Sequence, residues 1–296
     1  MRVSLPSETE TPSSLQLRRG EAADLEALET YLEARADTCM LVRGNLRQVG
    51  LAWSGRRYEA QYMLAWRDAS VVGVVGHAWN GMFVVQADEA VAELARATLA
   101  WSGRPVTGFA GPLEQVVEVR AALGLAGAKA SLDSDEILMS LRLDEVQVPP
   151  PLVDGRVRGR HAVAEDRDLL VSWRIGYTLE LLGKERGPEV EAEAADVIDA
   201  ALAEDRLWVL EDGGARVAMT SFNAMLPDCV QVGGVYTPPA LRGRGYARAV
   251  VAASLLEQRG RGVRRAVLFT AGADAEAAYR AIGFVATGRF GLVLLA

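Results

Sequence analysis

The residues of this sequence best placed to do chemistry are two glycines and two arginines within residues 241–247, "LRGRGYA". The stretch stands between an expected strand, "CVQVGGVYT", and an expected helix that starts near Gly245. Glycines at 243 and 245 let successive backbone N–H groups turn toward one anion, and the helix adds the positive end of its dipole. Arg242 and Arg244 supply further positive charge. The stretch therefore predicts a loop that binds a phosphate-bearing ligand.

Two well-known phosphate loops do not fit this stretch. A dinucleotide loop needs a third glycine or alanine, and Arg248 occupies that position. The strand that follows, "AVLFT", also ends without an acidic residue for a ribose hydroxyl. A nucleotide-triphosphate loop needs another spacing and a lysine, and both are missing.

The third loop type fits. "RGRGYA" matches R/Q-x-x-G-x-G/A, and the chain resembles a two-domain member of the GCN5-related N-acetyltransferase (GNAT) superfamily. Four pieces occur in the order of an FR47-like catalytic domain, "VGGVYTPP", "RGRGYA", "LFT" and "YRAIGF". The resemblance covers residues 155–296. It implies a tandem fold of mixed α+β class (α/β), in which each domain is a mixed, mostly antiparallel sheet flanked by helices.

The resemblance implies acetyl-CoA as co-substrate and no metal. In the family the strand before the loop separates from its neighbour at a bulge, which Gly233 and Gly234 would allow, and the pantetheine arm adds to it. Backbone amides of Val235 or Thr237 would polarise the thioester carbonyl. The predicted cofactor-binding residues are Val235, Tyr236, Thr237, Arg242, Gly243, Arg244, Gly245, Tyr246 and Ala247.

Two catalytic residues are predicted. Tyr279 matches the tyrosine that protonates the departing thiolate in many relatives, and its alternative role is core packing. Glu180 lies on the helix that borders the acceptor site in relatives and is the candidate general base; its alternative is a solvated carboxylate. Gly272 stands where relatives often carry Asn, which leaves Asp274 as a possible substitute.

The elements that must position these residues are arranged twice along the chain. Each half reads as strand, helix, hairpin, strand, helix, strand, helix and strand, with hairpin turns at residues 68–70 and 212–214. This repetition predicts two mixed α/β domains rather than one continuous sheet. We expect a flexible tail over 1–14, a degenerate GNAT-like domain over 15–147, a stiff proline-rich linker over 148–154 and a catalytic domain over 155–296.

The first half is expected to lack a coenzyme A site. At the position of the glycine loop it carries Asp88 and Glu89, without glycines. Two carboxylates cap a helix well but repel a pyrophosphate. We therefore expect the first half to stabilise the second and to help shape its site.

Composition excludes several classes of protein. The net charge of −7 argues against a nucleic-acid binder, and no stretch is apolar enough to span a membrane. Cys39 and Cys229 are expected to be buried free thiols, and neither cysteine nor histidine occurs at metal-ligand spacing. The N-terminus lacks a signal peptide, so a cytoplasmic location is expected.

The sequence thus predicts an acyl-CoA-dependent N-acetyltransferase that acts on a primary amine of a small molecule or peptide. The amine itself and the oligomeric state stay open. The alternative is a protein that binds or senses acyl-CoA without catalysis.

Overall fold

The computed structural model describes residues 14–181 and 183–296, so the predicted tail lies outside the described residues except for Ser14. The first half begins with a strand, a helical hairpin and three more strands: β1 (Leu15–Arg19), α1 (Leu25–Glu33), α2 (Ala36–Val49), β2 (Ala60–Arg67), β3 (Ser70–Ala78) and β4 (Met82–Ala87). It ends with two helices, each followed by a strand: α3 (Val91–Ser102), β5 (Gly108–Pro112), α4 (Leu113–Ala122) and β6 (Ala130–Arg142).

The second half repeats this order, as the sequence predicts. After the one-turn helix α5 (Pro150–Val153) come β7 (Val157–His161), α6 (Arg167–Leu181), α7 (Pro188–Ala203), β8 (Leu207–Asp212), β9 (Ala215–Met225), β10 (Cys229–Tyr236), α8 (Tyr246–Gly260), β11 (Arg265–Thr270), α9 (Ala273–Arg280) and β12 (Val285–Leu295). Short 3-10 turns precede α1 and α6. The predicted linker thus contains a helical turn, because proline is tolerated at the start of a helix.

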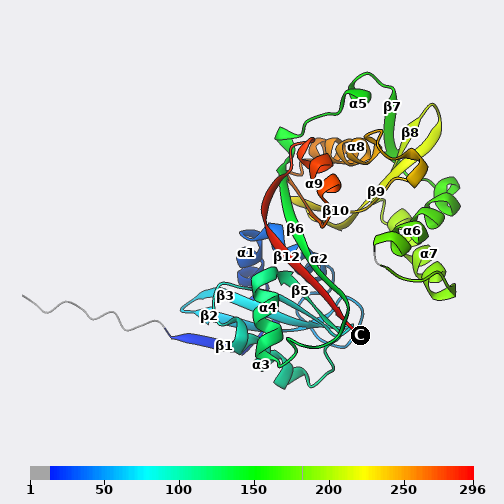
Figure 1. The fold of residues 1–296 in the computed structure, drawn as a ribbon. Coiled ribbons are helices and arrows are strands. Elements are labelled where there is room, and N and C mark those ends of the chain that lie inside the picture. The colour runs from blue at the N-terminus through cyan, green and yellow to red at the C-terminus, as the bar shows by residue number, and fades with distance from the viewer. Residues whose placement is uncertain (1–13, 182) are drawn as a thin grey trace, which may run out of the picture.

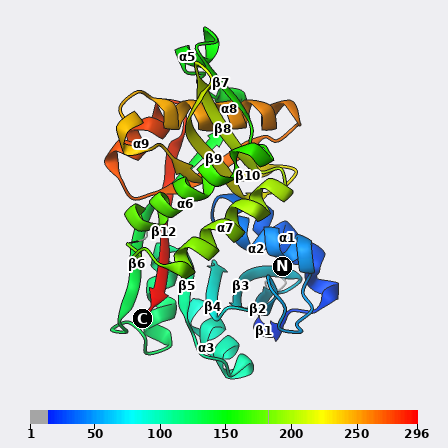
Figure 2. The ribbon, with the colours of Figure 1, turned by 90° about the vertical axis from the view of Figure 1, so that its right-hand side faces the viewer.

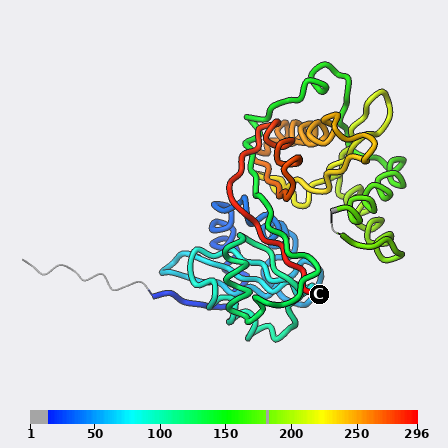
Figure 3. The backbone as a smooth tube through the Cα atoms, in the orientation of Figure 1, coloured from blue at the N-terminus to red at the C-terminus, as the bar shows by residue number. Residues whose placement is uncertain are grey.

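The described strands form one twelve-stranded sheet, in the order β1-β2-β3-β4-β5-β12-β6-β11-β10-β9-β8-β7. β12, from the second half, pairs with β5, while β6, from the first half, pairs with β11. β6 and β12 also pair with each other, from Val285↔Ser140 to Leu295↔Ala130, and run side by side between the two halves (Figure 1). The backbone trace shows the C-terminal segment returning to the first half (Figure 3).

The expectation of two sheets rather than one is therefore wrong. β5 and β11 each leave an edge of unpaired backbone groups, and the last strand of the other half fills that edge. Alternation of apolar residues predicts a strand and its buried face but not the strand beside it. Most pairings are antiparallel, with β4–β5 and β10–β11 parallel, which confirms the predicted mixed, mostly antiparallel class.

Helices cover both faces of the sheet. In the first half, α1 and α2 pack on one face through Leu28 and Leu46, and α3 and α4 on the other through Leu94 and Val119. In the second half, α6 and α7 cover the face that carries Leu207 and Val209 of β8. α8 covers the face with Trp208 and Leu210 of the same strand. Figure 2 shows α6 and α7 lying across the front of the sheet.

A buried arginine joins the two halves beside the shared strands. Arg43 of α2 is 1% exposed and donates to Glu29 of α1 and to Asp228, just before β10. Its Nη1 lies 3.1 Å from an Asp228 oxygen. The predicted buried free thiols are confirmed for Cys39 and Cys229.

Candidate active site

The glycine loop has the backbone conformation that the predicted anion site requires. Gly243 and Gly245 both have φ of 78°, and Gly245 is the N-cap of α8. A side chain at Gly243 would meet nothing within 4 Å, so its conformation alone favours glycine. The first N–H groups of α8 lack helical partners and point toward the loop.

The strand that leads to the loop separates from its neighbour. β10 pairs with β11 only from Cys229↔Arg265 to Gln231↔Val267. On its other side, the register with β9 shifts between Gly233 and Tyr236, which confirms the predicted bulge. Beyond Gln231, the β10 edge that faces β11 has no strand partner in the described part of the chain, so an extended ligand can pair with it.

Thr237 carries an unsatisfied polar group at the end of β10. The residue is 8% exposed, and its Oγ1 has no hydrogen-bond partner among residues 14–181 and 183–296. Its carbonyl accepts a hydrogen bond of 2.9 Å from Nε of Arg242. Buried hydroxyls without partners are unusual, so this atom marks a place where a ligand would supply the missing bond.

A cavity of about 450 Å³ lies between the loop and α9. Its lining residues are Thr237, Arg242, Gly243, Gly245, Tyr246, Ala247, Arg248, Asp274, Ala277 and Ala278. The structure thus brings together most of the predicted cofactor-binding residues, and Asp274 with them. Val235, Tyr236 and Arg244 are not part of this lining.

Glu180, the predicted general base, is held by two other predicted site residues. Tyr236 donates to Glu180 Oε1 over 2.9 Å, and Arg242 Nη2 donates to Oε2. The hydrogen bond from Arg242 lowers the pKa of the Glu180 carboxyl, and the bond from Tyr236 adds to this. A carboxylate stabilised in this way is a weaker proton acceptor, so these contacts favour a positioning role for Glu180.

Tyr279, the predicted general acid, lies on α9 with 9% of its surface exposed. Its ring packs edge-on against Phe284, with 6.0 Å between ring centroids. Burial raises the pKa of the Tyr279 phenol, and the nearby phenol of Tyr177 adds to this. The hydroxyl is therefore protonated at neutral pH, as a proton donor must be. Tyr279 thus packs in the core and does not line the loop cavity, and its role as the general acid stays a prediction.

In the first half, the turn before α3 corresponds to the glycine loop, and its acidic side chains form ion pairs within the first half. Asp88 is paired with Arg35 and Glu89 with Arg67. Ala90, the N-cap of α3, has φ of 57° and so stands in the conformation of Gly245. These paired carboxylates support the prediction that the first half does not bind a pyrophosphate.

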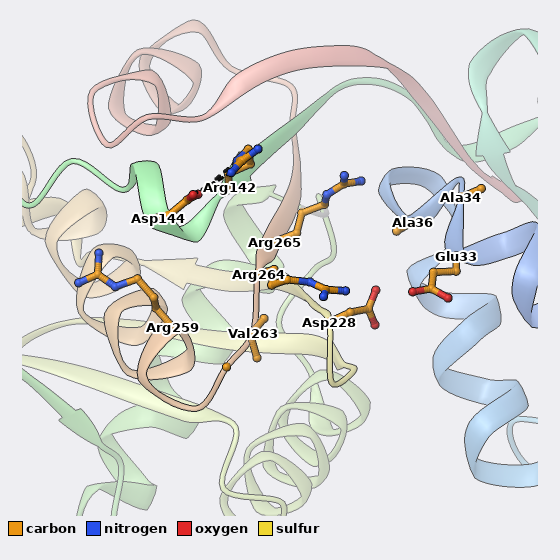
Figure 4. A pocket seen from close by; sticks show the side chains of 11 residues that line it. Glu33, Ala34, Ala36, Arg142, Asp144, Asp228, Arg259, Val263, Arg264 and Arg265 are labelled. Carbon is orange, nitrogen blue, oxygen red and sulfur yellow. Dashed lines mark hydrogen bonds and ion pairs between the residues drawn. The ribbon is translucent and has the colours of Figure 1, made fainter.

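A second cavity of about 610 Å³ lies between the halves, at the opposite end of β10 and β11 (Figure 4). In that view Arg264 points toward Asp228 and Glu33, while Arg142 is paired with Asp144. It shares no lining residue with the loop cavity. The described residues include no group of three metal-ligating side chains and no helix long and apolar enough to cross a membrane.

Arg248 and Gly176 are among the residues around the site that sequence reasoning missed. Arg248, which argued against a dinucleotide loop, lines the loop cavity, and its Nε lies 3.0 Å from the position of a Cβ on Gly245. Gly176 of α6 lies against Tyr236, whose hydroxyl would be 2.5 Å from a Cβ there. A positive residue one turn into the helix was a visible signal for Arg248, whereas nothing in the sequence pointed to Gly176.

Comparison with known proteins agrees with the geometry. Residues 173–284 match the model of the acetyltransferase (GNAT) family. Comparison with curated protein sequences gave no match.

Solved structures share the fold over almost the whole chain. A Drosophila protein superposes with a TM-score of 0.64 at 14% identity, covering 94% of this chain and 98% of its own. A GCN5-related N-acetyltransferase from Sphaerobacter thermophilus gives 0.57 at 14% identity, with 98% and 96% covered. A tandem GNAT protein from the clavulanic acid biosynthesis pathway gives 0.50 at 16% identity, with 95% and 98% covered.

The separated strands, the glycine loop at the start of α8 and the family match all fall in the same part of the chain. Residues 173–284 therefore form a domain of the acetyltransferase (GNAT) family, and the solved structures of GNAT proteins share their fold with 95–98% of this chain.

Proposed function

We propose that this protein transfers an acetyl group from acetyl-CoA to a primary amine, and that the second half carries the site. The observation that supports this most directly is the β10 edge, which separates from β11 and ends at a glycine loop beside a cavity of about 450 Å³. The first half binds no coenzyme A in this proposal. Its own turn carries Asp88 and Glu89, each paired with an arginine.

The residues present suit coenzyme A. N–H groups of the loop and of the first turn of α8 would bind the pyrophosphate, with Arg248 and Arg244 adding charge. Neither of these arginines forms an ion pair or side-chain hydrogen bond within the described residues. The β10 edge from Val235 to Thr237 would bind the pantetheine amides, and Thr237 Oγ1 would gain a partner.

Acetyl-CoA, when bound, supplies an activated thioester. Backbone N–H groups of Val235 or Thr237 would bind its carbonyl oxygen and stabilise charge that develops there. Tyr279 would hold the proton that the departing sulfur needs. Glu180 would hold Arg242 and Tyr236 in place at the rim, because both donate to its carboxylate.

An amine screen that follows the release of the coenzyme A thiol tests this function. Replacing Tyr279 by Phe should lower kcat by about a hundredfold or more, because a positioned acid contributes at least that much, and should leave acetyl-CoA affinity unchanged. Tyr62→Phe is the matched control, since Tyr62 is also buried but lies in the first half.

The rival function, acyl-CoA binding without catalysis, predicts another result. The wild-type protein would then bind acetyl-CoA and acetylate no amine. The ion pair between Arg242 and Glu180 favours this rival function, because it makes the predicted general base a weaker proton acceptor.

A further inference from the structure

Because β6 of the first half pairs with β11 of the second half, one carboxylate of the first half, Glu136, lies near the site of the second half. Glu136 lies on β6, where it is the direct partner of Phe290 on β12. The next residue, Ile137, pairs with Thr270, the last residue of β11. Glu136 therefore lies just beyond the end of β11, at the end where β10 and β11 have separated.

Strand alternation fixes the face on which Glu136 stands. Ile137 and Met139 belong to the core beneath α8. Glu136 and Ser140 therefore face the opposite side, where Ser140 donates to Asp37 of α2. This is the face that α6 covers in the second half.

An aromatic pair stands beside the carboxylate. Phe290 is directly opposite Glu136, and Phe269 of β11 is directly opposite Leu138, so all four side chains share one face. The rings of Phe269 and Phe290 stack with 4.2 Å between centroids. A carboxylate next to stacked aromatic rings, of which Phe269 is the partly exposed one, suits an ammonium group carried on an apolar or aromatic body.

Glu136 is coupled electrostatically to Tyr177 of α6, and Tyr177 to Tyr279. Burial raises the pKa of Tyr177, the charge of Arg174 lowers it, and the charge of Glu136 raises it. Tyr177 in turn adds to the raised pKa of Tyr279, after burial. Unlike Glu180, Glu136 forms no ion pair within residues 14–181 and 183–296, and its hydrogen-bond donor is the Ser134 hydroxyl at 2.9 Å. Burial raises the pKa of its carboxyl, which makes it a better proton acceptor than an exposed glutamate.

We propose that Glu136, supplied by the first half, binds the ammonium group of the acceptor and accepts its proton. This assignment rests on the proposed function and adds an acceptor class to it, a primary amine on an apolar or aromatic body. The acceptor must lose a proton because an alkylammonium has a pKa near 10.4, judged by lysine. In the step, one N–H bond of the ammonium breaks, its electron pair stays on nitrogen, and the proton moves to Glu136, which later returns it to water.

Other charged groups near Glu136 do not compete for this role. Arg174 lies over the ring of Tyr177, 4.6 Å from its centroid. Asp135 and Arg289 pair with each other and stand on the other face of the sheet. Activity should therefore rise with pH through a single carboxyl whose pKa lies above that of an ordinary glutamate, because only the deprotonated form accepts a proton.

Calorimetric titration of the full chain with 2-phenylethylamine tests the assignment, with 2-phenylethanol as the uncharged probe. Glu136→Gln should weaken amine binding by about tenfold to a hundredfold, because a charged hydrogen bond is lost. Asp135→Asn, the neighbouring carboxylate with its side chain on the other face, should change it by less than about twofold. Glu136→Asp should restore part of the affinity, and 2-phenylethanol should bind all variants alike.

A parallel titration with acetyl-CoA separates this assignment from the proposed function. Glu136→Gln should bind acetyl-CoA as the wild type does and should lose the acidic limb of the kcat/KM profile. Equal amine affinity in Glu136→Gln and Asp135→Asn, or no amine binding by the wild type, would overturn the assignment. Failure of the wild type to bind acetyl-CoA would remove the proposed function, while the amine titration would still decide the role of Glu136.

Discussion

Glu180 and Glu136 are both glutamates near the site, but their surroundings shift the pKa of the two carboxyls in opposite directions. Glu180 accepts hydrogen bonds from Arg242 and Tyr236, and the first of these lowers its pKa. Glu136 has one hydroxyl donor, and burial raises its pKa. The sequence alone favoured Glu180, because it lies on a helix near the expected site. It gave no reason to consider a residue in the last strand of the first half.

Glu180→Gln should therefore change the amine reaction only modestly. If Glu180 only holds Arg242 and Tyr236, kcat/KM should fall by less than about tenfold, since a general base is worth about 10² or more. The acidic limb of the pH profile of kcat/KM should be the same in Glu180→Gln as in the wild type. Steady-state kinetics across pH, beside Tyr236→Phe, which removes one of the same hydrogen bonds, checks this. Loss of the acidic limb in Glu180→Gln would restore Glu180 as the base.

At the scale of elements, the turn between β7 and α6 sets the direction of the helix that carries Tyr177 and Glu180. Asp166 is 1% exposed and accepts hydrogen bonds from Arg160, Arg216 and the Val163 N–H. Burial alone would raise the pKa of Asp166, but these donors outweigh it and hold the value at about 2. The two arginines reach Asp166 from β7 and β9, and the pairing with the distant Arg216 cannot be predicted from the sequence alone.

Asp166→Asn should lower the free energy of unfolding by about 3 kcal/mol at pH 7, because it breaks a buried charge network. The folded pKa lies below the unfolded value of about 3.9, so the stabilisation is present above pH 4 and is lost as pH falls toward 2. Urea unfolding at pH 7 and pH 3 measures the difference. Asp168→Asn, whose carboxylate is 97% exposed, should be nearly silent. A gap between wild type and Asp166→Asn that does not shrink at pH 3 would contradict this.

At the scale of the whole molecule, β6 and β12 join the two halves into one sheet. Val293 of β12 is 1% exposed and packs in the core of the first half, with Phe109 and Val116. Met139 of β6 packs in the core of the second half. Motifs and repeats could be predicted from sequence because each is a local pattern. The pairing of β6 with β11 and of β12 with β5 could not be predicted, because it depends on contacts between strands that are far apart in the sequence.

Val293→Asp should destabilise the first half although it lies in the last strand of the chain. Burying a charge in that core should lower the free energy of unfolding by about 3 kcal/mol or more. Val285→Asp on the same strand, where Val285 is 56% exposed, should have little effect. Hydrogen exchange of the Phe109 and Val116 amides locates the change. Unaltered protection there in Val293→Asp would speak against the shared strands.

The central claim, that the second half holds acetyl-CoA at its glycine loop, is tested most directly by calorimetric titration with acetyl-CoA. Gly243→Asp should abolish binding, because it adds a carboxylate to the loop. Gly213→Asp is the matched control: both glycines have positive φ, and a Cβ at either meets nothing within 4 Å, but Gly213 lies in the β8–β9 turn. We predict that the wild type and Gly213→Asp each bind one equivalent of acetyl-CoA per chain and that Gly243→Asp binds none. Two equivalents, or equal binding by both variants, would contradict the claim.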